Sequence, residues 1–340
     1  MMKKISVIGM GSWGTTLAIL LAEKGFSVFG WEWIKNRAEG MEKYRENKIF
    51  LPGCHFPDNA NSKYRMKISN DLDFVVENGD IILLAVPSHI IRKICESEKN
   101  LLAGKQIVNV AKGIENGSLM RMSEVIHDAT GISYENILTL SGPTHAEEVS
   151  KKLPATIVAA SKSKEFAKQI QNIFMTDFFR VYTSNDLVGV ELGGSTKNII
   201  AIGAGISSGM NLGDNAAAAL IARGLREITR LGIKFGANPH TFSGISGIGD
   251  LIVTCGSEHS RNRHVGVLLA KGKSLQKIID GMEMVAEGVK TTKSVYYLSE
   301  KFGIDMPITR QIYRVLFEGL SPQQALRNLM TREGKSEEEF

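Results

Sequence analysis

A lysine in apolar surroundings is the residue of this sequence best suited to move a proton. Lys197 stands in the run Glu191-Leu-Gly-Gly-Ser-Thr-Lys-Asn198, whose small and apolar residues have the spacing of a helix. Because an unpaired ammonium group is costly to bury, burial lowers the pKa of a lysine toward neutrality. Such a lysine can act as a general acid or base. The alternative is a lysine at the helix edge that extends its charged end into water.

A second group of residues offers a dense set of hydrogen-bond donors. It comprises Ser260, Arg261, Asn262, Arg263 and His264. The planar guanidinium group of arginine suits a phosphate dianion, and the Asn262 amide adds neutral donors. The alternative is a solvated run of charges on the protein surface. The pattern therefore indicates a site for a small anionic ligand.

The beginning of the chain carries a glycine pattern between a strand and a helix. Residues 5–8 are apolar and lead into Gly9-Met-Gly11-Ser-Trp-Gly14, which is followed by the apolar stretch 15–22. Gly9 permits the tight turn, Gly11 leaves room for a pyrophosphate, and Gly14 allows close packing of helix on strand. The helix N-terminus favours the negative charge of the phosphates. The alternative is an ordinary glycine-rich turn, but the strand before the glycines and the helix after them favour a dinucleotide site.

The second strand supports this interpretation. Residues 26–31 are rich in β-forming side chains and end in Glu32-Trp33. An acidic residue about 20 positions after the glycines is expected to accept hydrogen bonds from the adenosine ribose. Glu32 occupies this place and would repel a 2′-phosphate, while Trp33 could cover the adenine. The alternative is that Glu32 and Trp33 are ordinary surface residues.

Further polar residues follow the later strands. Lys112 comes directly after the strand predicted at 107–110, so it is expected to hold an anionic or carbonyl oxygen, unless it is a solvated lysine at a strand end. The turn at 141–146 opens a helix, and His145 within it is a general base or a helix-start residue. Residues 249–254, which include Asp250, are expected to begin a turn. Lys112 and the turn at 141–146 follow strands of the predicted parallel sheet, and ligands bind at the carboxyl ends of such strands.

Length and composition are those of an ordinary globular protein. The 340 residues suit two domains, with 43% hydrophobic and 23% charged residues. The net charge of +5 is spread along the chain, so we expect no nucleic-acid partner. Three separated cysteines indicate neither disulfides nor a metal site and are compatible with a reducing cytoplasm. The apolar run 81–86 is too short to cross a bilayer, so we expect a cytoplasmic protein without stable membrane insertion.

The elements that position these residues differ between the two halves. Strands expected at 5–8, 26–31, 81–86, 107–110, 137–140 and 155–159 indicate an α/β Rossmann-like N-terminal domain with a parallel sheet. The pattern breaks between Lys35 and Lys67. After about Asp186 the spacing becomes helical, which predicts an all-α C-terminal domain. The expected bounds are 1–186 for the dinucleotide-binding domain, 187–331 for the helical substrate domain and 332–340 for a frayed tail.

Together these motifs resemble the soluble NAD(P)-dependent glycerol-3-phosphate dehydrogenase family. The resemblance covers nearly the whole chain. It rests on the glycine turn and on Leu51-Pro-Gly53, Ala111-Lys-Gly113, Ser141-Gly-Pro143, Glu191 to Asn198, Gly249-Asp-Leu251, Ser260 to Arg263, and Glu287-Gly288.

The resemblance implies roles for individual residues. Lys197 would be the proton donor or acceptor. The substrate would be bound by Lys197 together with Lys112, Gly142, Thr144, Asp250, Ser260, Arg261 and Asn262. The cofactor would be bound by Gly9, Gly11, Ser12, Trp13, Gly14, Trp33, Lys112, Ala146, Arg261, Val285 and Glu287.

The implied reaction is the interconversion of dihydroxyacetone phosphate and sn-glycerol 3-phosphate with NAD(P)H, supplying glycerophospholipid synthesis. Bacterial members similar to this chain often carry arginine where Trp33 stands, which suits NADP, so the tryptophan favours NADH over NADPH. A homodimer is compatible with the sequence. Two alternatives stay open: a two-domain dehydrogenase that acts on a hydroxy or sugar acid, and a dinucleotide-responsive binding protein without turnover. The placement of Lys197 argues against the second.

Overall fold

The computed structural model describes residues 3–57, 66–282, 286–334 and 336–337. The chain folds into two compact units. The first comprises Met1–Ala111 and Met122–Leu187, and the second comprises Lys112–Arg121 and Val188–Phe340. The predicted functional boundary between residues 186 and 187 stays a prediction. Residues 112–121, however, belong to the helical unit although they follow a strand of the first unit.

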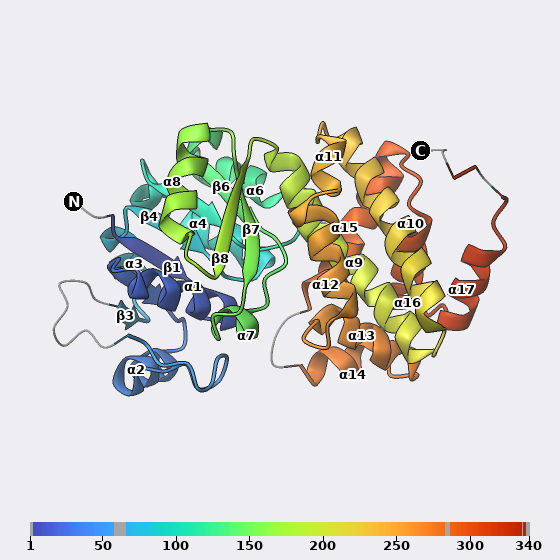
Figure 1. The fold of residues 1–340 in the computed structure, drawn as a ribbon, viewed down its shortest axis with the longest axis horizontal. Coiled ribbons are helices and arrows are strands. Elements are labelled where there is room, and N and C mark those ends of the chain that lie inside the picture. Colours follow the sequence, from blue (N-terminus) through green and yellow to red (C-terminus); the bar gives the residue numbers. More distant parts are fainter. Residues whose placement is uncertain (1–2, 58–65, 283–285, 335, 338–340) are drawn as a thin grey trace. The chain divides into compact units, whose positions relative to one another are not determined.

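The first unit is built on one eight-stranded sheet with helices on either side of it, with α8 in front and α4 and α6 behind in Figure 1. The strand order is β3-β2-β1-β4-β5-β6-β7-β8. Central strands such as β1 and β4 are buried at every position, because helices cover both faces. The strands are β1 (Ile5–Ile8), β2 (Val28–Trp31), β3 (Met66–Ser69), β4 (Ile81–Leu84), β5 (Gln106–Asn109), β6 (Ile137–Ser141), β7 (Ala155–Ser161) and β8 (Phe179–Ser184).

The Rossmann-like fold is confirmed, with differences in detail. The parallel sheet has one antiparallel pair, between β6 and β7. The break expected between Lys35 and Lys67 contains α2 and leads into β3, and β8 is a further strand that the pattern did not predict. The helices of this unit are α1 (Ser12–Glu23), α2 (Lys35–Tyr44), α3 (Leu72–Asn78), α4 (Ile91–Ser97), α5 (Lys99–Leu102), α6 (Met122–Thr130), α7 (Ala146–Val149) and α8 (Lys164–Phe174).

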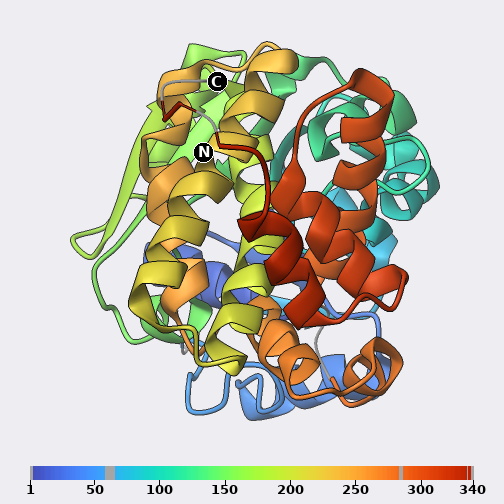
Figure 2. The same cartoon turned by 90° about the vertical axis from the view of Figure 1, so that its right-hand side faces the viewer.

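The second unit is helical, as predicted. Its longest helix, α9, is surrounded by other helices of the unit in both views (Figures 1 and 2). No helix in the described ranges has both the length and the apolar character needed to cross a membrane. The helices are α9 (Leu187–Gly209), α10 (Gly213–Lys234), α11 (Pro239–Phe242), α12 (Asp250–Gly256), α13 (Arg261–Ala270), α14 (Leu275–Asp280), α15 (Glu287–Phe302), α16 (Pro307–Phe317) and α17 (Pro322–Met330).

Glycines bring α9 and α13 into direct backbone contact. A Cβ atom added at Gly205 would lie 1.9 Å from the carbonyl oxygen of Arg263. One added at Gly266 would lie 2.0 Å from the carbonyl oxygen of Ile202. Since real atoms do not approach so closely, any side chain here would push the helices apart. This contact fixes the start of α13 relative to the helix that carries Lys197.

Candidate active site

The glycine turn has the shape that a dinucleotide pyrophosphate requires. Gly9 has φ +106°, and a Cβ atom there would lie 2.8 Å from the backbone nitrogen of Val86. A Cβ at Gly14 would lie 2.0 Å from the carbonyl oxygen of Gly9. At Gly11, by contrast, no atom lies within 4 Å of the added Cβ. Gly9 and Gly14 are therefore needed for packing, and Gly11 leaves open space beside the backbone.

The helix that follows this turn suits an anion. Helix α1 begins at Ser12 and has no acidic side chain in its first turn. Its N-terminal N–H groups and dipole favour a bound phosphate. The residues present therefore fit a dinucleotide in this unit.

A buried asparagine supports the turn, and sequence reasoning missed it. Asn47 is 1% exposed, and its amide donates to the Met10 carbonyl at 2.7 Å and to the Thr15 hydroxyl at 2.8 Å. Its own oxygen accepts from the Phe50 N–H at 3.1 Å. Asn47 thus joins the region before Leu51 to the glycine turn. A lone Asn in a polar segment gives no periodic signal that could have marked it.

The end of β2 holds the residues expected near the ribose and adenine. Glu32 is 4% exposed, so it is not an ordinary surface residue. Its carboxylate accepts the Ile34 N–H at 3.1 Å, and burial raises the pKa of Glu32 despite this bond. Trp33 is 70% exposed. Trp13 packs partly against the core, with its ring 6.3 Å from that of Phe179.

Two ammonium groups of the second unit converge on one carboxylate. Lys197 from α9 donates to Oδ1 of Asp250, and the Lys112 ammonium lies 2.8 Å from Oδ2 of the same residue. Lys197 also donates to the Thr254 hydroxyl at 2.7 Å. That hydroxyl donates in turn to the Asp250 carbonyl at 2.6 Å, which orients its lone pairs toward the lysine.

The burial of this cluster changes the acidity of Lys197. Lys197 is 5% exposed and Asp250 is 1% exposed, so the lysine does not extend into water. Burial, with a smaller contribution from the Lys112 ammonium, lowers the pKa of Lys197 to about 7 against the opposing charge of Asp250. A lysine with this acidity can give or take a proton at neutral pH.

Asp250 begins a helix, where the sequence predicted a turn. Residues Ile245–Gly249 form a π-helical turn that continues into α12. The turn lies against α9, because a Cβ atom at Gly193 would lie 2.8 Å from the Ser246 carbonyl oxygen. Single π turns often occur at functional sites. Here the turn places the first residue of α12 beside Lys197.

The donor-rich run forms the start of α13. The Ser260 hydroxyl accepts the Arg263 N–H at 3.2 Å and caps the helix. Asn262 is buried, and its oxygen accepts the Gly288 N–H at 2.9 Å, which ties α13 to α15. Arg263 donates to the Ser208 hydroxyl at 3.0 Å, whereas Arg261 is exposed. Of the two arginines, Arg261 is the more exposed.

The remaining predicted residues are distributed over both units. In the first unit, the Thr144 hydroxyl donates to the Gly142 carbonyl at 3.2 Å, and a Cβ at Gly142 would lie 2.8 Å from the Thr156 carbonyl oxygen. Ala146 is buried and begins α7. Glu287 is the first residue of α15 in the second unit. Val285 lies outside the described residues.

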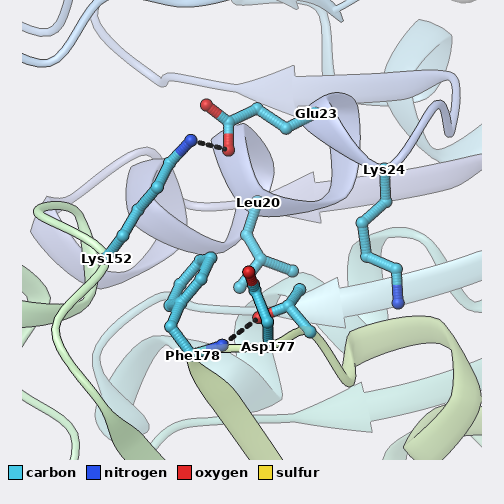
Figure 3. Close-up of a pocket in the computed structure, with 7 residues that line it drawn as sticks. Leu20, Glu23, Lys24, Lys152, Asp177 and Phe178 are labelled. Atoms are coloured by element: carbon cyan, nitrogen blue, oxygen red, sulfur yellow. Dashed lines mark hydrogen bonds and ion pairs between the residues drawn. The ribbon is translucent and has the colours of Figure 1, made fainter.

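A pocket of about 420 Å³ lies elsewhere in the first unit (Figure 3). It is lined by Leu20, Glu23, Lys24, Lys152, Thr176, Asp177 and Phe178. The Lys152 ammonium pairs with the Glu23 carboxylate at 3.0 Å. Because these residues surround the C-terminal end of α1, the pocket is separated from the glycine turn by nearly the length of that helix. It is not the dinucleotide site.

Comparison with known proteins agrees with this geometry. The model of the NAD-dependent glycerol-3-phosphate dehydrogenase N-terminus matches residues 4–167, and the model of the C-terminus of the same family matches residues 186–327. A glycerol-3-phosphate dehydrogenase (NAD(P)+) of Prosthecochloris aestuarii is 51% identical over 98% of this chain and 99% of its own. The enzyme of the same name from Pelotomaculum thermopropionicum is 48% identical over 98% and 95%.

Solved structures give the same result. The crystal structure of glycerol-3-phosphate dehydrogenase from Coxiella burnetii aligns with a TM-score of 0.91 at 38% identity, over 97% of this chain and 99% of that one. The enzyme of Saccharomyces cerevisiae aligns with a TM-score of 0.82 at 27% identity, over 98% and 100%. This chain belongs to the NAD-dependent glycerol-3-phosphate dehydrogenase family.

Proposed function

We propose that this protein catalyses the reversible reduction of dihydroxyacetone phosphate to sn-glycerol 3-phosphate with a nicotinamide cofactor, supplying glycerophospholipid synthesis. Membership of the family supports the reaction. The observation that carries the mechanism is the buried contact of Lys197 with Asp250. A reduced nicotinamide, when bound, supplies the hydride.

Lys197 is the general acid of the reduction. Reduction of the ketone would place negative charge on its oxygen, and the Lys197 ammonium would stabilise that charge and donate the proton. In the opposite direction the neutral amine removes the proton of the alcohol. Since burial brings the pKa of Lys197 to about 7, both forms are accessible near neutral pH.

Asp250 holds Lys197 in place and also binds the Lys112 ammonium. One carboxylate faces two ammonium groups, each on a different oxygen. The side chain of Lys112 is 20% exposed, so its ammonium is accessible enough to bind an oxygen of the substrate. Ser260 caps α13, and the buried Asn262 ties α13 to α15, so the start of α13 is fixed. From this fixed start, Arg261 binds the phosphate. Gly142 and Thr144 of the first unit stay predicted substrate residues.

The phosphate assignment is tested by comparing two ketones. With purified protein and NADH, dihydroxyacetone phosphate should be reduced and unphosphorylated dihydroxyacetone should be a very poor substrate. Arg261→Ala should raise the KM for the phosphorylated ketone strongly, with some loss of kcat, because charge-assisted bonds are roughly twice as strong as neutral ones. Equal kcat/KM for the two ketones would contradict a phosphate site.

We further propose that NADH is preferred over NADPH. Glu32 lies buried at the end of β2, where its charge would repel a 2′-phosphate. Trp33 stands where an arginine would be needed to hold that phosphate. Steady-state kcat/KM with both cofactors decides the matter: wild-type protein should favour NADH, and Glu32→Ala combined with Trp33→Arg should move the preference toward NADPH. Equal or better use of NADPH by the wild type would refute this proposal. A cytoplasmic location, a homodimer and the absence of a nucleic-acid partner stay predictions.

A further inference from the structure

A second buried ion pair lies close in sequence to the lysine cluster, and the mechanism above does not use it. The Arg121 guanidinium donates to the Glu191 carboxylate at 2.6 Å. The two side chains are only 13% and 5% exposed. Removing one partner of such a pair leaves the other charge in a poorly solvated place, which is costly. The pair therefore holds its two elements together firmly.

The pair closes the segment that begins with Lys112. Residues 112–121 leave the strand β5 and fold back on themselves, because Ile114 and Arg121 form an antiparallel bridge. Inside this turn the Glu115 N–H donates to the Met120 carbonyl at 2.9 Å. The Ser294 hydroxyl of α15 donates to the Ile114 carbonyl at 3.1 Å, and the Ile114 side chain is buried in the core of the helical unit.

Both ends of this segment are fixed near the same helix. Glu191 and Lys197 lie on α9, six positions apart. Glu191 holds Arg121 at one end of the segment, while Asp250 connects Lys112 at the other end to Lys197. The position of Lys112 therefore depends on two ion pairs, Arg121–Glu191 and Lys112–Asp250.

We propose that the Arg121–Glu191 pair is a positioning device that holds segment 112–121 on α9 and so keeps the Lys112 ammonium on Asp250 for substrate binding. This inference rests on the proposed function, in which Lys112 binds substrate. Arg121 acts through Lys112 and has no direct role in proton transfer. Loss of the pair frees one end of the segment, and Lys112 then occupies its position for a smaller fraction of the time.

Release of Lys112 has a consequence for Lys197 that loss of stability alone would not have. Within the described part of the chain, the charged or titratable groups that interact with Lys197 are Asp250 and Cys255 on α12 and Lys112 on the segment. Lys112 lowers the pKa of Lys197, and Asp250 raises it. When Lys112 moves away, its repulsion falls and water gains access, so the pKa of Lys197 rises. The pH above which ketone reduction declines should then move upward.

The experiment compares Arg121→Met with Arg121→Lys and with a surface control. The control is Arg310→Met, which removes another pair of the same unit, to Glu300 at 2.8 Å, in which both side chains are 46% exposed. For Arg121→Met we expect a KM for dihydroxyacetone phosphate about 10- to 100-fold higher, since small misplacements of binding groups have effects of this order. The fall in kcat should be smaller, and the alkaline limb of kcat should shift to higher pH. Arg121→Lys should restore most of the KM, and Arg310→Met should match the wild type.

A measurement independent of turnover separates this inference from the proposed function. Deuterium uptake of the peptide covering 112–121 should rise in Arg121→Met and not in Arg310→Met, whatever the substrate is. If Arg121→Met does not fold, the double variant Arg121→Met/Glu191→Gln, which leaves no lone buried charge, replaces it with the same expectations. Unchanged uptake, or unchanged KM and pH limb in a folded variant, would overturn the positioning role. Raised uptake in a protein whose wild type does not reduce the ketone would refute the proposed function instead.

Discussion

Lys197 is surrounded by groups that serve its proton transfer: a carboxylate and a hydroxyl accept from its ammonium, and a second ammonium lies on the far oxygen of that carboxylate. Lys197→Met should therefore lower kcat by about 10²–10⁴-fold, the usual contribution of a general acid. The dissociation constant of NADH, measured by fluorescence titration, should stay almost unchanged. Lys271→Met, at an exposed position, is the control. A Lys197→Met enzyme with near-normal kcat would remove this lysine from the mechanism.

The acidity of Lys197 predicts opposite pH profiles for the two directions of the reaction. Reduction requires the ammonium form, which is lost as the pH rises through the lowered pKa of about 7. Oxidation of glycerol 3-phosphate requires the neutral amine, which is gained over the same range. Plots of kcat against pH should thus show a falling limb for reduction and a rising limb for oxidation near the same pH. Limbs at the pH of an ordinary lysine, near 10, would contradict the effect of burial.

Sequence reasoning found the chemistry of single residues better than the contacts among them. The apolar surroundings of Lys197 indicated its lowered pKa, because burial follows from the local pattern. Asn47, Arg121 and Glu227 carry buried polar contacts that no local pattern reveals, since each partner is distant in the sequence. Glu191 was noted only as part of a motif. Such contacts depend on the tertiary structure.

At the scale of elements, glycines bring the backbones of α9 and α13 into direct contact. Gly266→Ala would place a methyl group 2.0 Å from the Ile202 carbonyl oxygen, a backbone atom that cannot move aside alone. We expect a loss of stability of about 1–3 kcal/mol, typical of overpacking, and a higher KM because Arg261 moves with α13. Gly40→Ala on α2 is the control, since no atom lies within 4 Å of its added Cβ. It should stabilise the protein by about 0.5–1 kcal/mol. Urea unfolding measures both, and a Gly266→Ala protein as stable as the wild type would show that the helices tolerate separation.

The elements that sequence reasoning missed share a physical cause. The strands β3 and β8 are the two edges of the sheet. An edge strand has a neighbouring strand on one side only. In β8, buried and exposed residues alternate over Phe179–Tyr182. The search for fully apolar runs, which found the central strands, does not detect this pattern. The antiparallel pairing of β7 is likewise invisible in its residues, because both directions bury the same side chains.

At the scale of the whole molecule, the two units can be observed separately. All three tryptophans, Trp13, Trp31 and Trp33, lie in the first unit. Tryptophan fluorescence therefore reports the unfolding of that unit, while far-ultraviolet circular dichroism at 222 nm also reports the helical unit. If the units unfold independently, a change confined to the second unit should shift the unfolding transition seen at 222 nm and leave the transition seen by tryptophan fluorescence unchanged.

Glu227 on α10 offers such a change. It is 2% exposed, and it accepts the Ile308 N–H at 2.5 Å and both the N–H and the hydroxyl of Thr309 at 3.1 and 3.0 Å. The carboxylate thereby satisfies the start of α16, where the helix dipole favours a negative charge. Burial outweighs these donors and raises the pKa of Glu227 from 4.5 to about 7.

The raised pKa fixes the sign of a pH effect on stability. Between pH 4.5 and about 7 the folded state binds more protons at Glu227 than the unfolded state does, so the free energy of unfolding falls as the pH rises through this range. Position 227 cannot titrate in Glu227→Gln. The difference in stability between the two proteins therefore cancels the contributions of all other titratable groups. The stability of the wild type relative to Glu227→Gln, from urea unfolding followed at 222 nm, should therefore decline from pH 4.5 to pH 7, by an amount on the order of 1–3 kcal/mol. A difference that is constant or rises with pH would show that the three hydrogen bonds outweigh burial and keep the carboxylate charged in the folded protein.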